Sequence, residues 1–291
     1  RYLAVGAIEP QFYAMLRERL GLAGDDAFDR QWDAAAWPVL KARLAGLFAE
    51  RPRDAWLART RALVDEWKQS FAALRASDAV PMRPERLCKE ISDALPEDAI
   101  VVSDTGHSGI WTGALIEFTK KGQRLIRCAG SLGWGLPGAI GVKCAQPDKT
   151  VVCFAGDGGV YYHMAELETA ARYGINIVLV VNNNSALNQE IKLNDAAYGG
   201  KQRGRAEEMW RFPEVNFAKI AEGFGCAGIR VTKASEINGA IKEGIAMNKP
   251  VVISMPKPIE RRVASSMTMT PVTPMMMSCG VGAPGRSASW L

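Results

Sequence analysis

The sequence lacks the features that mark several classes of protein. Its 291 residues contain no run of about 18 apolar residues, the length that a membrane-spanning helix needs. It has only two histidines, His107 and His163, and none of its six cysteines belongs to a CxxC pair, so we expect no structural zinc site. The 36 basic and 31 acidic residues give a net charge of +5, spread along the chain. This small excess does not indicate a nucleic-acid partner.

The two ends of the chain and its cysteines support further expectations. The first residue is Arg1 and no signal peptide opens the sequence, so we expect the natural start to lie upstream. The cysteines are widely spaced, which favours buried, reduced thiols in a cytoplasmic protein; they are Cys88, Cys128, Cys144, Cys153, Cys226 and Cys279. The last 29 residues, from Val263, have five methionines, no acidic residue and one basic residue, Arg286. We interpret 259–291 as a disordered tail, with a shifted reading frame, translation past a natural stop or a Met-rich binding surface as alternatives.

Hydrophobic periodicity divides the rest of the chain into two parts. Apolar residues at helical spacing predict helices from Pro10 to about Gly21, from Trp37 to before Pro52, and over about 53–75, followed by a proline-containing linker at 76–84. Beyond residue 84, short apolar runs alternate with helical patterns. These predict strands at 100–102, 150–155, 175–181, 228–231 and 251–254, and helices at 135–145, 160–173, 217–224 and 235–246. The pattern predicts an α/β fold, a doubly wound parallel sheet with helices on both faces, preceded by a short helical segment.

Two polar motifs follow neighbouring strands of this predicted sheet. Gly156-Asp157-Gly158 comes after the apolar run TVVCFA, and Asn183-Asn184 follows after 24 intervening residues, at the end of INIVLVV. Glycine and aspartate after a strand often form only a turn. With one crossover helix between the strands, however, both motifs fall at the carboxyl edge of adjacent parallel strands. This is where ligands of such sheets bind.

The chemistry of these residues suits a magnesium diphosphate. Mg²⁺ prefers oxygen ligands in octahedral geometry and often takes some of them from a phosphate group. Asp157 offers a charged oxygen, Asn184 a neutral amide oxygen, and a backbone carbonyl of the following turn another. Gly158 and Gly159 allow the backbone to approach phosphates, and the next helix directs its N-terminus at them.

These motifs resemble the diphosphate-binding domain of thiamine diphosphate enzymes of the acetolactate synthase, pyruvate oxidase and benzoylformate decarboxylase type. The resemblance runs over about residues 60–258. It rests on DTGHSGIW (104–111), AGSLGWGLPGAIGVKCAQPD (129–148), GDGGVYYHMAELETAARYGINIVLVVNNNSALNQ (156–189) and FAKIAEGFG (217–225). It implies a thiamine diphosphate- and Mg²⁺-dependent enzyme that decarboxylates or joins 2-oxo acids.

The resemblance also implies roles for single residues. Asp157, Asn184 and the carbonyl of Ala186 match the metal ligands of the family, and Leu132 matches a bulky residue that supports the bent cofactor. The remaining matches to cofactor-binding positions are His107, Ser108, Gly130, Ser131, Gly156, Gly158, Gly159 and Leu187. Acetolactate synthases usually show Gln-His where this chain has His107-Ser108, which leaves the substrate open.

Several of these residues also have simpler interpretations. His107 is then a solvent-facing loop residue, His163 a packing or capping residue, and Leu132 a core residue. Residues 182–184 are then a plain turn. The basic run of Lys201, Arg203 and Arg205 in a glycine-rich loop is then a solvated loop, with contact to an anionic substrate as the alternative.

The chain lacks the other half of the site that the resemblance implies. A glutamate on a separate pyrimidine-binding domain activates the cofactor in that family, and nothing in residues 1–83 resembles this domain. We therefore identify no catalytic residue, and the resemblance leaves His107 as a candidate contact to the substrate. We expect a homo- or hetero-oligomer that includes a pyrimidine-binding domain, and we expect the isolated chain to be inactive. A cofactor-binding module without turnover is the non-enzymatic alternative.

The first residues resemble a different family. YLAVGAIEPQFYAMLRERLGLAG (2–24) and WPVLKARLAGLFAERPRDAWLA (37–58) are similar to alpha-methylacyl-CoA racemase, of the family III CoA-transferase group. Glu9 matches a position that assists the base there, or simply leads into a helix at Pro10. The alternative function is therefore a CoA-thioester racemase or transferase fragment. We expect four segments: 1–60, racemase-like; 61–83, helix and linker; 84–258, the diphosphate domain; and 259–291, the tail. Either the chain is a chimera or the racemase likeness is a chance helical similarity.

Overall fold

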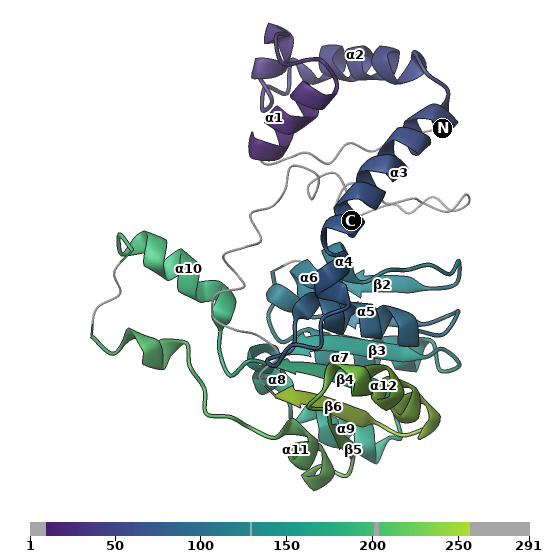
Figure 1. Cartoon of the computed structure of the whole chain (residues 1–291), viewed down its shortest axis with the longest axis vertical. Helices are drawn as coiled ribbons and strands as arrows, with labels where there is room; N and C mark the ends of the chain where they lie inside the picture. Colours follow the sequence, from purple (N-terminus) through teal and green to yellow (C-terminus); the bar gives the residue numbers. More distant parts are fainter. Residues whose placement is uncertain (1–9, 129, 201–203, 257–291) are drawn as a thin grey trace. The chain divides into compact units, whose positions relative to one another are not determined.

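The computed structural model describes residues 10–128, 130–200 and 204–256 (Figure 1). Contacts divide this described chain into two units, residues 10–70 and 71–256. The division falls after Ser70, inside the predicted segment 61–83. The boundaries at 60 and 83 stay predictions. The predicted tail, 259–291, lies outside the described residues.

The first unit is helical, as expected. It contains α1 (Pro10–Arg19), a 3₁₀ turn η1 (Asp26–Asp29), α2 (Trp37–Ala49) and α3 (Arg53–Ser70). Proline stands in the first turn of α2, where its missing N–H leaves no hydrogen bond unmade. Phe28 and Leu40 are buried, and Arg17 pairs with Asp29 at 2.6 Å.

The second unit is built on one sheet of six strands, all parallel. The strands are β1 (Ile100–Ser103), β2 (Arg124–Arg127), β3 (Val151–Gly156), β4 (Ile177–Asn183), β5 (Ala227–Arg230) and β6 (Val251–Pro256). Their order is β2-β1-β3-β4-β6-β5. The central strands β3 and β4 are buried along almost their whole length, which is why they appear in the sequence as continuous apolar runs. The order reverses between β1 and β3, and this reversal creates a crevice at the carboxyl ends of these strands.

Helices cover both faces of the sheet (Figure 1). One face carries α5 (Pro84–Ala94), α6 (His107–Leu115) and α12 (Ile237–Ala246), which pack on one another and on the sheet. The other face carries α7 (Gly135–Ala145), α9 (Glu166–Arg172) and α11 (Phe217–Gly223) around a continuous apolar core. The remaining elements are α4 (Ala72–Arg75), α8 (Asp157–His163), α10 (Asn188–Ala197), η2 (Ala206–Met209) and η3 (Ala234–Glu236). The predicted doubly wound α/β fold is confirmed.

The structure corrects several details of the prediction. The helix expected at 160–173 is two helices, α8 and α9, and the first begins at Asp157 itself. The helix expected over 53–75 is interrupted after Ser70. Strand β2 and the helices α6 and α10 were not predicted; all four residues of β2 are exposed, so it leaves no apolar run.

Two further expectations concern burial and membranes. Cys88, Cys153 and Cys226 are buried free thiols, but Cys144 is exposed and Cys128 only half-buried, so the expectation of uniformly buried cysteines was wrong. Within the described ranges, no helix has both the length and the apolar character to cross a bilayer.

Candidate functional site

A pocket lies where β1, β3 and β4 end, at the reversal of strand order. Three segments line it: 105–108 after β1, 156–159 after β3, and 182–190 at the end of β4 and the start of α10. Gly130 and Leu132, from the loop before α7, complete the lining. Its volume of about 170 Å³ is smaller than the roughly 300–1,000 Å³ of most small-molecule sites. A pocket of this size encloses only part of a cofactor-sized ligand.

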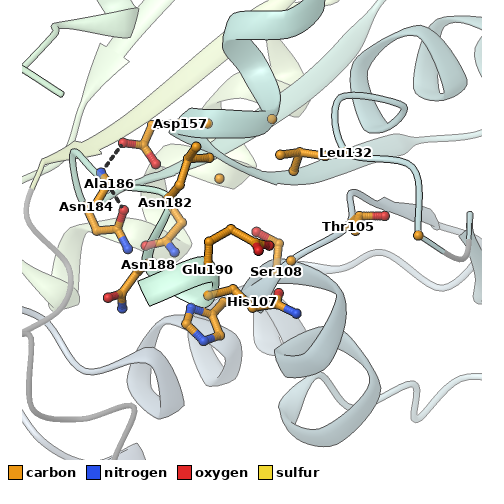
Figure 2. Close-up of a pocket in the computed structure, with 17 residues that line it drawn as sticks. Thr105, His107, Ser108, Leu132, Asp157, Asn182, Asn184, Ala186, Asn188 and Glu190 are labelled. Carbon is orange, nitrogen blue, oxygen red and sulfur yellow. Dashed lines mark hydrogen bonds between the residues drawn. The ribbon is translucent and has the colours of Figure 1, made fainter. Parts of the chain in front are cut away.

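The two polar motifs converge in this pocket (Figure 2). The Oδ2 atom of Asp157 accepts a hydrogen bond from the backbone N–H of Ala186 at 3.1 Å. The Oδ1 atom of Asn184 accepts from the same N–H, also at 3.1 Å. A carboxylate, an amide and the backbone of one turn are therefore gathered around a single point, as the spacing of the motifs predicts.

A short antiparallel pairing fixes the orientation of Ala186. The N–H of Leu187 donates to the carbonyl of Trp210 at 2.9 Å, and the N–H of Phe212 donates to the carbonyl of Ser185 at 2.9 Å. Ala186 lies between these bonds, opposite Arg211. In such a ladder the N–H and C=O of the middle residue point away from the partner strand. The Ala186 carbonyl is therefore directed to the same side as its N–H, which is the side of Asp157.

Gly158 lies where the two motifs approach each other closely. A Cβ atom on Gly158 would lie 2.6 Å from Cδ2 of Leu187, and within 3.8 Å of Phe212 Cε2. The absence of a side chain at Gly158 leaves this space to the side chains of Leu187 and Phe212.

Asp104 is hydrogen-bonded to the loop that carries Leu132. Its carboxylate is 1% exposed and accepts hydrogen bonds from the backbone N–H groups of Thr105, Gly133 and Gly135. Burial raises the pKa of Asp104, and these three hydrogen bonds oppose the shift. The carboxylate joins the end of β1 to the loop before α7, so the Leu132 side of the pocket is held in place.

Asp157 is electrostatically unusual. It is 2% exposed, and burial raises its pKa from an ordinary 3.8 to about 6, although backbone N–H groups lower it in part. No cationic side chain of the described residues is among its partners. Buried carboxylates usually have a cationic partner or bind a metal. Among the described residues, no cluster of three His, Cys, Asp or Glu side chains could hold a metal, so a cation here would depend on one carboxylate and neutral oxygens.

The structure brings together all but one of the residues expected at the site. Ser131 is the exception, because it is exposed and does not line the pocket. His107 lines the pocket and stacks on Trp111 at 5.2 Å between ring centroids. The other residues of the expected set that line the pocket are Ser108, Gly130, Leu132, Gly156, Asp157, Gly158, Gly159, Asn184, Ala186 and Leu187.

Other expected and unexpected residues can now be placed. His163 is exposed at the end of α8. Of the basic run, Lys201 and Arg203 lie outside the described residues, and Arg205 is exposed and pairs with Glu208. The sequence analysis missed six lining residues: Thr105, Gly106, Asn182, Asn188, Gln189 and Glu190. The position of Asn182, two residues before Asn184 at the end of β4, was the signal that could have identified it.

Comparison with known proteins now adds to this geometry. Residues 104–255 match the family described as thiamine pyrophosphate enzyme, C-terminal TPP binding domain. This match covers more than half of the chain. The chain belongs to the thiamine pyrophosphate (TPP) enzyme family. The resemblance seen in the sequence is confirmed, and the matched part is the C-terminal TPP-binding domain of that family.

Individual relatives agree with this assignment. The domain is similar to a probable acetolactate synthase large subunit of Methanococcus aeolicus, with 28% identity over 65% of this chain and 33% of the relative. It is 29% identical to the benzoylformate decarboxylase of Pseudomonas aeruginosa over 62% of this chain and 33% of that protein. A solved structure, the thiamine diphosphate-dependent 4-hydroxybenzoylformate decarboxylase of Rhodococcus jostii RHA1, superposes with a TM-score of 0.55 and 27% identity over 64% of this chain and 34% of the other.

The TPP-binding domain is one part of such proteins. The chain spans about a third of the length of the relatives it matches. The family match begins at residue 104, so the likeness of residues 1–58 to a CoA racemase stays a prediction. A racemase or transferase function is not favoured, because the site described above belongs to the TPP enzyme family.

Proposed function

We propose that the pocket binds the diphosphate of thiamine diphosphate through Mg²⁺, and that the chain is the diphosphate-binding part of an enzyme acting on 2-oxo acids. The observation that carries this proposal is the buried carboxylate of Asp157, which has no cationic partner in the described part of the chain and lies beside Asn184 and the turn at Ala186. Side-chain oxygens of Asp157 and Asn184 and the carbonyl of Ala186 would hold the cation. These are the hard oxygen ligands that Mg²⁺ prefers.

The residues present fit this cofactor. A cation would neutralise the Asp157 carboxylate, which burial otherwise disfavours. Gly158 and Gly159 would let the diphosphate approach the backbone, and His107 and Ser108 would contact it from the end of β1. Gly130 and Leu132 would contact the rings. When bound, thiamine diphosphate supplies a nucleophilic carbon and an electron sink for breaking or forming bonds beside a carbonyl carbon.

The proposed enzyme needs a second domain. We propose a partner that contributes the pyrimidine-binding half of the site, in a homo- or hetero-oligomer, and decarboxylation or joining of 2-oxo acids as the reaction. The names of the relatives, acetolactate synthase and benzoylformate decarboxylase, support this class. The free thiols of the described cysteines support a reducing, cytoplasmic location.

Calorimetric titration of the full chain with thiamine diphosphate tests the proposal, first in Mg²⁺ and then in EDTA. We expect binding that requires Mg²⁺. A ligand that binds only the folded state, at about 100 times its Kd, adds about 2.7 kcal/mol of stability, so the melting temperature should rise with the cofactor. Asp157→Ala should abolish both effects. Asp98→Ala is the matched control, because Asp98 is a half-exposed carboxylate paired with Lys149.

Three outcomes would contradict parts of the proposal. Stabilisation by acyl-CoA, without any response to Mg²⁺ and thiamine diphosphate, would favour the racemase-like alternative. Decarboxylation of a 2-oxo acid by the purified chain alone would contradict its interpretation as half of a site. Cofactor binding that never supports turnover with any pyrimidine-binding partner would instead indicate a binding module.

A further inference from the structure

Asn182 has a buried polar atom that the fold leaves unused. The residue is 2% exposed and lines the pocket (Figure 2), and its Oδ1 atom has no hydrogen-bond partner among the residues that the structure describes. An unsatisfied buried acceptor destabilises the folded state. Such a group in a pocket indicates a ligand that donates a hydrogen bond.

The sheet offers no structural reason for an amide at this position. Side chains alternate along β4, so Asn182 shares a face with Val178 and Val180, which are buried and apolar. Its neighbours in register are Gly156 on β3 and Met255 on β6. Asn183, on the opposite face, differs, because its amide donates to the carbonyl of Val215 at 2.8 Å and accepts from the N–H of Ser185. Asn183 is thus accounted for by the fold, and Asn182 is not.

The position of Asn182 relates it to the proposed cation. It stands two residues before Asn184, and its register partner Gly156 immediately precedes Asp157. Gln189, which also lines the pocket, has a second unpartnered buried acceptor, Oε1. The pocket therefore presents spare acceptors near the proposed metal ligands, where a donor is expected.

The coordination number of Mg²⁺ indicates which group is that donor. Mg²⁺ takes six oxygens, and the three protein ligands together with a diphosphate need not complete this number; Mg²⁺ usually keeps some of its water. Water polarised by the cation is a strong donor. We propose that Asn182 Oδ1 accepts a hydrogen bond from a water bound to the Mg²⁺, which makes Asn182 a further binding residue of the site. This inference rests on the proposed function.

The test compares the full chain with Asn182→Val, which continues the row of Val178 and Val180. Without ligand, Asn182→Val should melt at the same temperature as the unsubstituted protein or higher, because an unsatisfied acceptor has been removed. Its affinity for Mg²⁺ with inorganic diphosphate, measured by calorimetry, should fall about tenfold, the effect of one charge-assisted hydrogen bond. Asn176→Val is the matched control, because Asn176 precedes the opposite end of β4, is not part of the pocket lining and bonds Asn248 at 2.7 Å. Asn176→Val should bind as the unsubstituted protein does.

A second variant and a second ligand keep the test decisive. Asn182→Asp retains an acceptor and should bind Mg²⁺ and diphosphate at least as tightly as the unsubstituted protein. Equal affinities of Asn182→Val and the unsubstituted protein, or a tenfold loss in Asn182→Asp, would overturn the inference. A loss seen only with thiamine diphosphate and not with inorganic diphosphate would also overturn it, because the donor would then be an amino group of the cofactor. If the unsubstituted protein binds neither ligand in Mg²⁺, the proposed function itself fails.

Discussion

The Asp104 carboxylate accepts a hydrogen bond from the backbone N–H of Gly133 at 2.9 Å, although 29 residues separate the two in the chain. The same carboxylate accepts from Gly135 at 3.1 Å, at the first residue of α7. Asp104 therefore acts as a cap for a helix on a different part of the chain, and it holds the loop that carries Leu132 against the end of β1. The shape of this side of the pocket depends on one buried side chain.

Asp104→Asn should lower stability markedly. Both carboxylate oxygens accept backbone N–H groups, so an amide would place its own N–H group against one of these donors. We expect a loss of about 1–3 kcal/mol in the free energy of unfolding, measured by urea denaturation. Asp98→Asn is the control: Asp98 is a half-exposed partner of Lys149, and its loss should be less than about 1 kcal/mol. Similar small losses in both variants would contradict the role of Asp104.

Gly159→Ala should destabilise the protein by overpacking against the same carboxylate. A Cβ atom at Gly159 would lie 2.8 Å from Asp104 Oδ2 and 3.0 Å from its Cγ, and neither atom can move without breaking backbone hydrogen bonds. We expect a cost of about 1–3 kcal/mol in the same urea experiment. Gly141→Ala is the matched control in helix α7, since a Cβ there meets nothing within 4 Å. It should be neutral or gain up to about 1 kcal/mol of stability, and an equal loss at both sites would count against this explanation.

The convergence of Asp157 with the turn after β4 was predictable because of local patterns. Strands β3 and β4 are buried on both faces, so their apolar runs are continuous, and parallel strands joined by one helix end at the same edge. Strand β2 was missed because it is a short, fully exposed edge strand, Arg124–Arg127. Apolar periodicity carries no signal for such a strand.

The hydrogen bonds that the Asp104 carboxylate accepts, and the role of Asn182, could not be predicted in this way. The partners of Asp104 are backbone N–H groups, which have no sequence signature, and they are distant in the chain. Asn182 looked like the first residue of a turn, whereas the strand continues through Asn183 and buries both amides. Only the tertiary arrangement distinguishes the amide that bonds within the fold from the one that faces the pocket.

Phe212→Ala should weaken Mg²⁺-dependent diphosphate binding as well as lower stability. The ring of Phe212 packs edge-on against Tyr161 of α8 at 5.1 Å, and its backbone pairs with Ser185. Removing the ring should loosen residues 210–212, which orient Ala186, while losing about 0.5–1.5 kcal/mol from the aromatic pair. Calorimetry should show a severalfold higher Kd. Tyr173→Ala removes an exposed ring that is not part of the pocket lining and serves as the control. If the Kd of Tyr173→Ala rises as much as that of Phe212→Ala, the pairing at Ala186 does not explain the effect.

The pH dependence of stability should reveal the buried carboxylate of Asp157. In the ligand-free folded protein its pKa is about 6, against an ordinary value of 3.8. The folded state therefore holds this proton more tightly than the unfolded state does. The resulting stabilisation is fully present below about pH 4 and is lost as the pH rises through about 6. Asp157→Asn cannot titrate, so its stability should lack this component.

The measurement is the difference in unfolding free energy between the unsubstituted protein and Asp157→Asn across this window. The unsubstituted protein should lose stability relative to Asp157→Asn as the pH rises from about 4 to about 6. Above about pH 6 the difference should stay constant. The pKa of Asp104 is also raised, but Asp104 is present in both proteins, so the comparison isolates Asp157. Saturating Mg²⁺ and diphosphate should reverse the trend for the unsubstituted protein, because a metal-bound carboxylate must be deprotonated. Parallel curves for the two ligand-free proteins would mean that Asp157 ionises in the folded state at its ordinary pKa, and the argument for a cation from its burial would then be lost.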